Sequence, residues 1–311
     1  MTNILIHTEN LGKVYASGKN AIRALEGLNL DVRQGEIFGY LGPNGAGKTT
    51  TIRLLLDLIR PTEGRASIFG QPVGAGSLEI HRRIGYMPGE LSLWRNLTGH
   101  QVVHYIASVR GDIASQKAEA KRIAERLDLD LTRRIRDYST GNKRKVGLVL
   151  ALMHKPALLI LDEPTSGLDP LMQQTFNQMM REVRQEGRSV FLSSHMLSEV
   201  QAICDRVGIL RDGRLRAIET VEALTHVDFR RVLLDLSEPA PKSVVERLSS
   251  LEGVSELEAS NARLTLKLQG DFDPLLRAIN GIYIKDLRVE EPTLEEIFLT
   301  FYGDAHNHKE R

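Results

Sequence analysis

A glycine-rich stretch that ends in lysine and threonine, GPNGAGKT from Gly42 to Thr49, has the spacing of a phosphate-binding loop. It follows an apolar segment, Ile37 to Leu41, and opens a helical pattern, which is the context that this motif requires. Glycines allow backbone N–H groups to turn toward phosphate oxygens, and the N-terminus of a helix adds positive potential. We therefore expect the phosphates of a nucleotide to be bound by Gly42, Pro43, Asn44, Gly45, Ala46, Gly47, Lys48, Thr49 and Thr50.

Two acidic residues, Asp162 and Glu163, come directly after the apolar run LLIL. Such a run predicts a short buried strand that ends at the two carboxylates. Beside a phosphate loop, Asp162 and the Thr49 hydroxyl are expected to ligate Mg²⁺, while Lys48 places a positive charge against the phosphates. Glu163 then becomes the general base that activates water. Taken alone, two acids after a strand are as often simply solvated, so this interpretation depends on the phosphate loop.

The elements that must position these residues alternate between strands and helices. Strand patterns at IFGYL, ALLILDEP, RSVFLSSH and RVGILRDGR are separated by helical patterns, and helical periodicity also fills Leu91 to Arg136. The first residues are rich in strand patterns as well. This order predicts an α/β fold with a β-rich N-terminal part and a mainly parallel sheet that has helices on both faces.

The sequence pattern changes between Glu219 and Val227. The remainder follows the order strand, helix, strand, strand, helix, strand, which is the ferredoxin-like α+β pattern, and then a short helix, TLEEIFLTFYG. We expect a first domain over residues 1–222, with a helical subdomain at about 91–136, and an accessory domain over 223–311.

Composition limits the possible functions. The chain has 311 residues, enough for about two domains, and a net charge of +1, which argues against binding to nucleic acid through an overall positive field. Its one cysteine fits a reducing compartment. The N-terminus lacks the pattern of a signal peptide, and no apolar run approaches the roughly 20 residues of a membrane span. We expect a chain that does not cross a bilayer by itself.

Together these motifs resemble the ATP-binding subunits of ABC transporters, from Ile4 to about Thr220. GPNGAGKTT resembles the Walker A motif and LLILDE the Walker B motif of that family. SGLDP resembles the D-loop, which implies that Asp169 lies at a dimer seam. His195 matches the switch histidine that contacts the γ-phosphate, and Tyr15 matches the aromatic residue that stacks on adenine.

The stretch YSTGNKRK, from Tyr138 to Lys145, stands where the family has its LSGGQ signature. Ser139 and Gly141 match the signature, whereas Asn142 replaces glutamine. The resemblance implies that these three residues close over ATP held by the phosphate loop of a second subunit. A serine hydroxyl and glycine N–H groups at a helix N-terminus suit that purpose. The three bases at 143–145 suggest a nucleic-acid patch or, as we favour, residues that start a helix near that phosphate or hold it to neighbouring acids.

One position departs from the family. In IGYMPGEL, Gly89 stands where a glutamine normally senses Mg²⁺ and the attacking water, and Glu90 follows it. Glu90 either substitutes for the glutamine or takes part in docking. The C-terminal part, which ends in DLRVEEPTLEEIF, resembles the extension of ABC-2-type exporter ATPases of the drug and antibiotic resistance group.

The resemblance implies an ATPase that uses ATP and Mg²⁺ and drives export of a drug-like or lipid-like compound. Its partners would be an integral membrane permease and a second ATPase subunit, either a copy or a close relative, at the cytoplasmic face of the membrane. Nucleic acid is not expected. Two alternatives are a soluble ABC ATPase that acts on nucleic acid or the ribosome, and a binding module that does not hydrolyse ATP.

Overall fold

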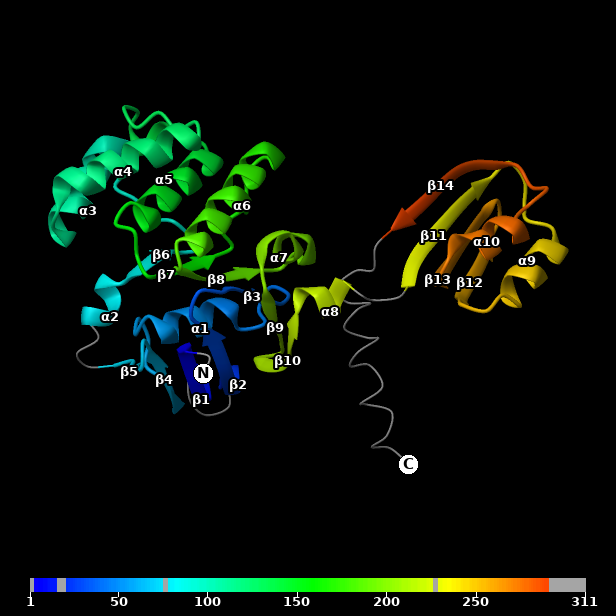
Figure 1. The fold of residues 1–311 in the computed structure, drawn as a ribbon, viewed down its shortest axis with the longest axis horizontal. Coiled ribbons are helices and arrows are strands. Elements are labelled where there is room, and N and C mark those ends of the chain that lie inside the picture. Colours follow the sequence, from blue (N-terminus) through cyan, green and yellow to red (C-terminus); the bar gives the residue numbers. More distant parts are fainter. Residues whose placement is uncertain (1–2, 16–20, 75–77, 226–228, 291–311) are drawn as a thin grey trace. The chain divides into compact units, whose positions relative to one another are not determined.

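The computed structural model describes residues 3–15, 21–74, 78–225 and 229–290. The chain divides into two compact units, Met1–Val221 and Glu222–Arg311, and α8 (Val221–Thr225) contains the division (Figure 1). The expected final helix, TLEEIFLTFYG, and the tail after it lie outside the described residues.

A six-stranded sheet forms the centre of the first unit, in the order β10-β9-β3-β8-β7-β6. Its parallel strands are β3 (Ile37–Leu41), β6 (Ile84–Met87), β7 (Leu158–Asp162), β8 (Ser189–Ser194) and β9 (Arg206–Arg211), and β10 (Arg214–Thr220) joins β9 antiparallel. Parallel strands end at one edge of a sheet, so the segments after β3, β7 and β8 lie close together. These three segments carry the phosphate loop, the two acids and His195.

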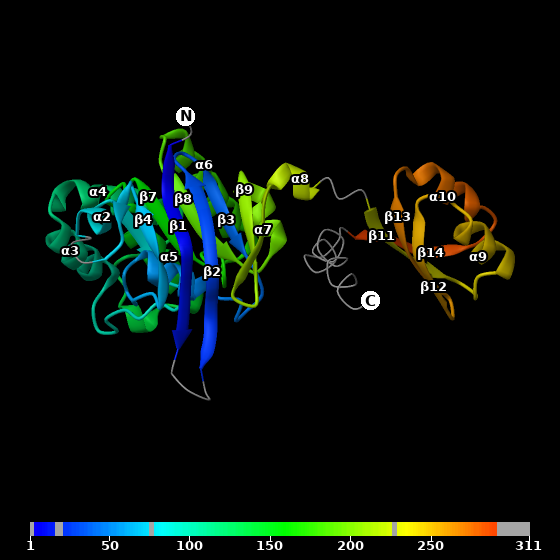
Figure 2. The same cartoon turned by 90° about the horizontal axis from the view of Figure 1, so that it is seen from below.

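A second, antiparallel sheet has the order β2-β1-β4-β5. It consists of β1 (Ile4–Tyr15), β2 (Ile22–Arg33), β4 (Glu63–Ile68) and β5 (Gln71–Pro72). The pair β1–β2 forms a long ribbon (Figure 2). Helix α1 (Lys48–Leu55) lies between the two sheets and shares one apolar core with them, which includes Ile6, Leu30, Phe38, Tyr40, Ile52, Leu55 and Phe191.

The helices of the first unit lie mainly on the other side of the central sheet (Figure 1). They are α3 (Gly99–Arg110), α4 (Ile113–Arg126), the 3₁₀-helix η2 (Ile135–Asp137), α5 (Thr140–Leu152), α6 (Pro170–Gln185) and α7 (Leu197–Ile203). The short helix α2 (Leu78–Arg82) instead contributes Ile80 to the core between the two sheets. The expected helical start at Leu91 is wrong, because residues 91–98 are not helical. A capping box between Thr98 and Gln101 satisfies both backbone N–H groups and starts α3 at Gly99.

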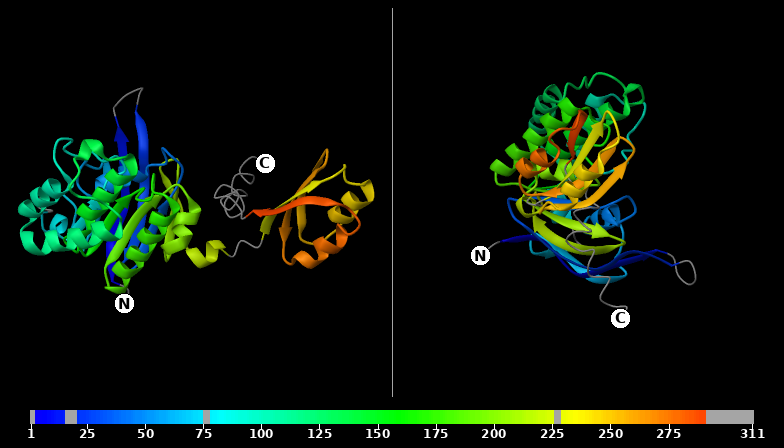
Figure 3. Two further views of the ribbon diagram at one scale, coloured as in Figure 1. Left: turned by 90° about the horizontal axis from the view of Figure 1, so that it is seen from above. Right: turned by 90° about the vertical axis from the view of Figure 1, so that its right-hand side faces the viewer.

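The second unit is a four-stranded antiparallel sheet in the order β12-β13-β11-β14. Its elements are β11 (Phe229–Leu236), α9 (Lys242–Ser249), β12 (Val254–Ser260), β13 (Arg263–Gln269), α10 (Phe272–Ala278) and β14 (Ile284–Glu290). Both helices cover one face of the sheet (Figure 3), and alternate residues of β11 and β13 are buried beneath them. This is the order and topology of the ferredoxin-like pattern. In the part of the chain that the structure describes, no helix combines the length and the apolar character needed to cross a bilayer.

Candidate functional site

The phosphate loop occupies the turn between β3 and α1. Gly47 has a φ of +108°, and a Cβ there would lie 2.5 Å from the carbonyl oxygen of Ala24, so a larger residue would disrupt the turn. A cavity of about 220 Å³ opens at the loop. It is lined by Ala24, Asn44, Gly45, Gly47, Lys48, Thr49, Thr50 and Glu163, most of which were expected to bind phosphate.

Lys48 is buried, and its ammonium group is held by three oxygen atoms. It donates to the carbonyls of Gly42 at 2.7 Å and Pro43 at 3.2 Å. Its Nζ also lies 3.4 Å from Oε1 of Glu163. A buried charge needs such partners, and a phosphate that enters the loop would compete with Glu163 for this ammonium group.

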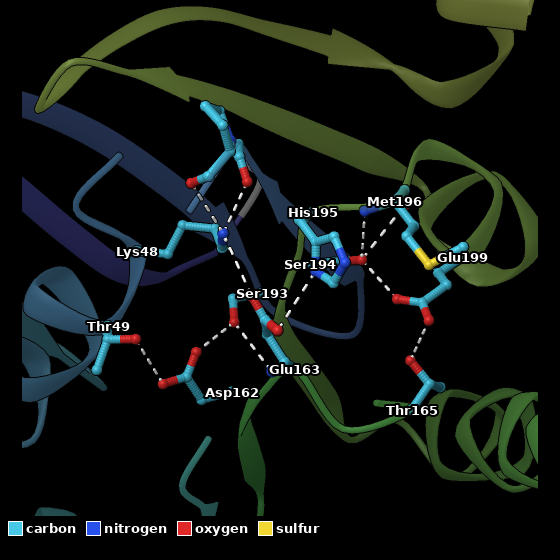
Figure 4. Close-up of polar contacts among 12 residues, drawn as sticks. Lys48, Thr49, Asp162, Glu163, Thr165, Ser193, Ser194, His195, Met196 and Glu199 are labelled. Carbon is cyan, nitrogen blue, oxygen red and sulfur yellow. Dashed lines mark hydrogen bonds and ion pairs between the residues drawn. The ribbon is translucent and has the colours of Figure 1, made fainter. Parts of the chain in front are cut away.

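Asp162 is buried at the end of β7 and joins two neighbouring segments (Figure 4). Its Oδ2 accepts a hydrogen bond from the Thr49 hydroxyl at 2.8 Å, and its Oδ1 accepts one from Ser193 at 2.5 Å. The Ser193 hydroxyl in turn accepts a hydrogen bond from the backbone N–H of Glu163 at 3.1 Å. These bonds fix the carboxylate against α1.

The oxygen atoms of Thr49 and Asp162 suit Mg²⁺. They are hard donors that already meet at 2.8 Å, and among the described residues no group of three or more His, Cys, Asp or Glu side chains gathers as a protein cage. Mg²⁺ is typically held by one or two protein oxygens together with substrate phosphates and water. The donor set therefore fits the expected ion.

Glu163 and His195 meet at the same edge of the sheet. His195 Nδ1 lies 3.3 Å from Oε2 of Glu163, and the two side chains are 42% and 24% exposed, so water can reach both. Glu163 has a φ of +49°, a sparsely populated conformation for a residue with a side chain, and such conformations gather at functional sites. Glu163 thus touches Lys48 through one carboxylate oxygen and His195 through the other.

The signature residues lie at the start of α5 and not in the cavity at the phosphate loop of their own chain. Ser139 is exposed and caps the helix, accepting a hydrogen bond from the Asn142 N–H at 3.2 Å. A Cβ at Gly141 would lie 2.9 Å from the carbonyl oxygen of Gly167, in the expected D-loop, so this position favours glycine. Asp169 is likewise exposed and caps α6, accepting from Met172 N–H at 3.0 Å.

Tyr15 lies at the end of β1 and does not line the cavity at the phosphate loop. The Lys13 ammonium group lies over the Tyr15 ring, 5.4 Å from the ring centroid. The ring is partly exposed, and its contact with adenine stays a prediction.

Two of the three bases in the signature stretch form hydrogen bonds within their own chain. Arg144 donates to the carbonyl of Pro88 at 3.2 Å, and Lys145 donates to the carbonyl of Asp128 at 3.4 Å. Burial lowers the pKa of Arg144, although the charges of Glu163 and Asp162 oppose the shift. Arg144 therefore connects the signature helix to the segment that contains Gly89. A Cβ at Gly89 would lie 3.1 Å from Oδ2 of Asp162.

Sequence reasoning missed the polar residues that support the site. Ser193 holds Asp162, while Thr165, Ser194 and Glu199 form a second group of hydrogen bonds beside His195 (Figure 4). The adjacent serines in VFLSSH were a usable signal, because polar residues at the end of a buried strand face the same sheet edge as the motifs.

Comparison with known proteins places this arrangement in context. A family model described as ABC transporter matches residues 25–166. The chain is 31% identical to the linearmycin resistance ATP-binding protein LnrL of Bacillus subtilis (strain 168), covering 96% of this chain and 98% of that protein. It is 33% identical to the bacitracin transport ATP-binding protein BcrA of Bacillus licheniformis, covering 96% and 97%.

A solved structure, described as the dimeric structure of MJ0796, a bacterial ABC transporter cassette, is 25% identical. It aligns with a TM-score of 0.65 over 70% of this chain and 99% of that one. These likenesses confirm the expected fold class.

Proposed function

Because the chain belongs to the ATP-binding subunits of ABC transporters, we propose that it is the motor of an exporter, in which two such subunits close around ATP and drive a membrane permease. As a member of this family, the protein binds and hydrolyses ATP. The single observation that carries the proposed mechanism is the contact of Glu163 with both Lys48 and His195, beside the Thr49–Asp162 pair. It brings a base, a cation and a metal-binding pair to one sheet edge.

The residues divide the chemistry among them. The N–H groups of the phosphate loop and the Lys48 ammonium group hold the phosphates, and Mg²⁺ held by Thr49 and Asp162 supplies charge neutralisation when bound. Entry of the γ-phosphate draws Lys48 away from Glu163 and frees that carboxylate. Glu163 accepts a proton from water as the water oxygen bonds to the γ-phosphorus, and the bond from that phosphorus to the ADP oxygen breaks. His195, 3.3 Å from Glu163, orients the base and contacts the transferred phosphoryl group.

A second subunit completes each site. Ser139, Gly141 and Asn142 lie outside the cavity of their own phosphate loop, at the exposed start of a helix. Together with Asp169 they would cap the phosphates held by the partner subunit, because N–H groups at a helix N-terminus attract anions. The dimeric cassette structure among the relatives supports this arrangement.

The cargo proposal rests on the relatives. LnrL and BcrA are described as resistance and transport proteins for linearmycin and bacitracin, which supports export of a drug-like or lipid-like compound from the cytoplasmic face of the membrane. They do not favour the alternative of an ATPase that acts on nucleic acid or the ribosome, and the internal contacts of Arg144 and Lys145 agree with this. The test is co-purification of the chain with an integral membrane protein from detergent extracts. Association with ribosomes or DNA instead would overturn the proposal.

The surface of the helical region contains a candidate docking site for the permease. A cavity of about 780 Å³ is bounded by α2, α3, α4 and the segment after α5, and its charged lining consists of the cations Arg82, Arg110 and Lys155 and the acid Asp112. Arg110 donates only to the backbone carbonyls of Arg82 and Ile84 within the described residues, and burial lowers its pKa. Val109 of α3 lines the cavity and is exposed, and Tyr105 is exposed on the same helix. This surface suits an amphipathic permease segment that carries an acidic side chain.

We expect Arg110→Glu to lower the amount of permease recovered with the chain at least about tenfold, because an acidic segment would meet a like charge. ATP hydrolysis by the isolated subunit should stay near the wild-type rate. Quantitative pull-down from detergent-solubilised membranes measures this. The control is Lys121→Glu, which makes the same charge change at an exposed residue of α4 outside the cavity. Equal recovery of permease with Arg110→Glu and wild type would place the contact elsewhere.

Lys48→Ala should weaken binding of ATP about 10- to 100-fold, because hydrogen bonds from a charged donor are worth about 1.5–3 kcal/mol. Isothermal titration calorimetry with ATP and Mg²⁺ measures the dissociation constant, and phosphate release measures the accompanying loss of turnover. Lys48→Arg, which retains the charge, is the conservative comparison. An unchanged dissociation constant for Lys48→Ala would remove Lys48 from the binding site.

A further inference from the structure

Glu199 bridges two segments of the site from the first turn of α7 (Figure 4). Its Oε1 accepts a hydrogen bond from the Thr165 hydroxyl at 2.5 Å, and its Oε2 accepts one from the Ser194 hydroxyl at 2.5 Å. Thr165 and Ser194 are 4% and 1% exposed, so water does not compete for these donors. Hydrogen bonds to a carboxylate are short and roughly twice as strong as neutral ones. The bridge is therefore a strong link.

The two donors belong to the segments that carry Glu163 and His195. Thr165 lies in the turn after Glu163, where the Ser166 N–H donates to the Glu163 carbonyl at 3.3 Å. Ser194 directly precedes His195, and its hydroxyl accepts from the Met196 N–H at 3.0 Å, which closes the turn around the histidine. One carboxylate thus connects the turn after β7 with the turn after β8.

Neither Glu163 nor His195 is fixed by burial of its own side chain. They are 24% and 42% exposed and touch at 3.3 Å, so their separation depends on the backbone that carries them. A displacement of about 1 Å in a catalytic arrangement costs up to about 100-fold in rate.

We propose that Glu199 is a positioning residue that holds the turns after β7 and β8 at the separation in which Glu163 and His195 act together. This inference rests on the proposed roles of those two residues. Glu199 does not touch ATP or the attacking water in this mechanism. It acts through Thr165 and Ser194 on the backbone of the catalytic pair.

Removing the bridge should lower kcat and leave ATP binding intact. We expect Glu199→Ala to lower kcat about 100-fold and Glu199→Gln, which keeps one acceptor, about tenfold, with the ATP dissociation constant within about twofold of wild type. Thr165→Val should lower kcat about tenfold, whereas Thr165→Ser, which keeps the hydroxyl, should restore most of it. Phosphate release and calorimetry with ATP and Mg²⁺ measure both quantities on the full chain.

A double variant separates positioning from a general structural role. In the His195→Ala background, Glu199→Ala should lower kcat by less than about threefold further, because residues that act as a unit are not additive. A full additional 100-fold loss, or a loss of ATP affinity that accompanies the loss of kcat, would overturn the inference. Unchanged kcat in Glu199→Ala would also overturn it.

The same experiments keep the inference apart from the proposed function. If His195→Ala and Glu163→Gln themselves leave turnover at the wild-type rate, the proposed mechanism fails. If both lose turnover while Glu199→Ala and Thr165→Val do not, only the positioning role of Glu199 fails.

Discussion

Glu163→Gln should lower ATP turnover about 1,000-fold, within the range of 10²–10⁴ that general acid–base catalysis contributes. The amide cannot accept a proton from water, but it has nearly the shape of the carboxylate and retains one oxygen, which can face either Lys48 or His195. ATP should therefore still bind. Because hydrolysis no longer resets the closed state, a dimer with bound ATP should accumulate, which light scattering after gel filtration detects as a doubling of mass.

The matched control is Glu186→Gln, which makes the same change at an exposed carboxylate paired with Arg188 after α6. It should hydrolyse ATP at the wild-type rate and should not accumulate the dimer. Glu163→Gln that remains monomeric at saturating ATP would argue against the closed dimer. Turnover at the wild-type rate would remove Glu163 from the role of base.

The parts of the site that sequence reasoning identified are those with a local pattern. The phosphate loop and the two acids each lie within about ten residues, and their strand or helix flanks predict where their side chains emerge. The phosphate loop and the two acids lie close together because the strands before them are parallel. The Thr49–Asp162 hydrogen bond joins residues that are 113 positions apart in the sequence. The family assignment, which later comparison confirmed, added Ser139 and Asp169, whose roles stay proposals.

The parts that sequence reasoning missed depend on contacts between distant segments. Glu199 meets Thr165 across 34 positions, and Arg144 meets Pro88 across 56. Neither partner can be chosen from spacing, because many acids and bases in the chain have similar neighbours. The packing of α5 and α7 against the sheet determines which residues Arg144 and Glu199 contact.

Strand β10 was missed although its signal is present. The dipeptide Asp212-Gly213 separates β9 from β10, and both residues have positive φ, at 50° and 72°, as a tight hairpin turn requires. The edge strand RLRAIET is only partly buried, so its apolar pattern was weak. The turn is therefore the stronger sequence indicator of this hairpin.

Ser139→Arg should abolish ATP hydrolysis while the isolated subunit binds ATP with nearly the wild-type dissociation constant. Ser139 is exposed at the start of α5 and does not line the cavity at its own phosphate loop, so an arginine there leaves that cavity intact. In the closed dimer the same side chain would occupy the space of the partner's γ-phosphate. We expect turnover to fall at least about 100-fold, because a displacement of only about 1 Å in a catalytic arrangement can already cost about that much. The control is Ala118→Arg, which adds the same side chain at an exposed position of α4.

Mixing two inactive variants decides whether the signature acts on its own chain or on the partner. Ser139→Arg keeps an intact phosphate loop, and Lys48→Ala keeps an intact signature. A mixed dimer therefore contains one complete composite site and one site in which both the phosphate loop and the signature are altered. In an equal mixture, half of the dimers are mixed and half of their sites are complete, which predicts recovery of about a quarter of wild-type turnover if the sites are independent. If the signature served the phosphate loop of its own chain, no subunit in the mixture would be complete, and turnover would stay at the level of the single variants. Recovery of activity on mixing therefore follows only from a site that two chains share.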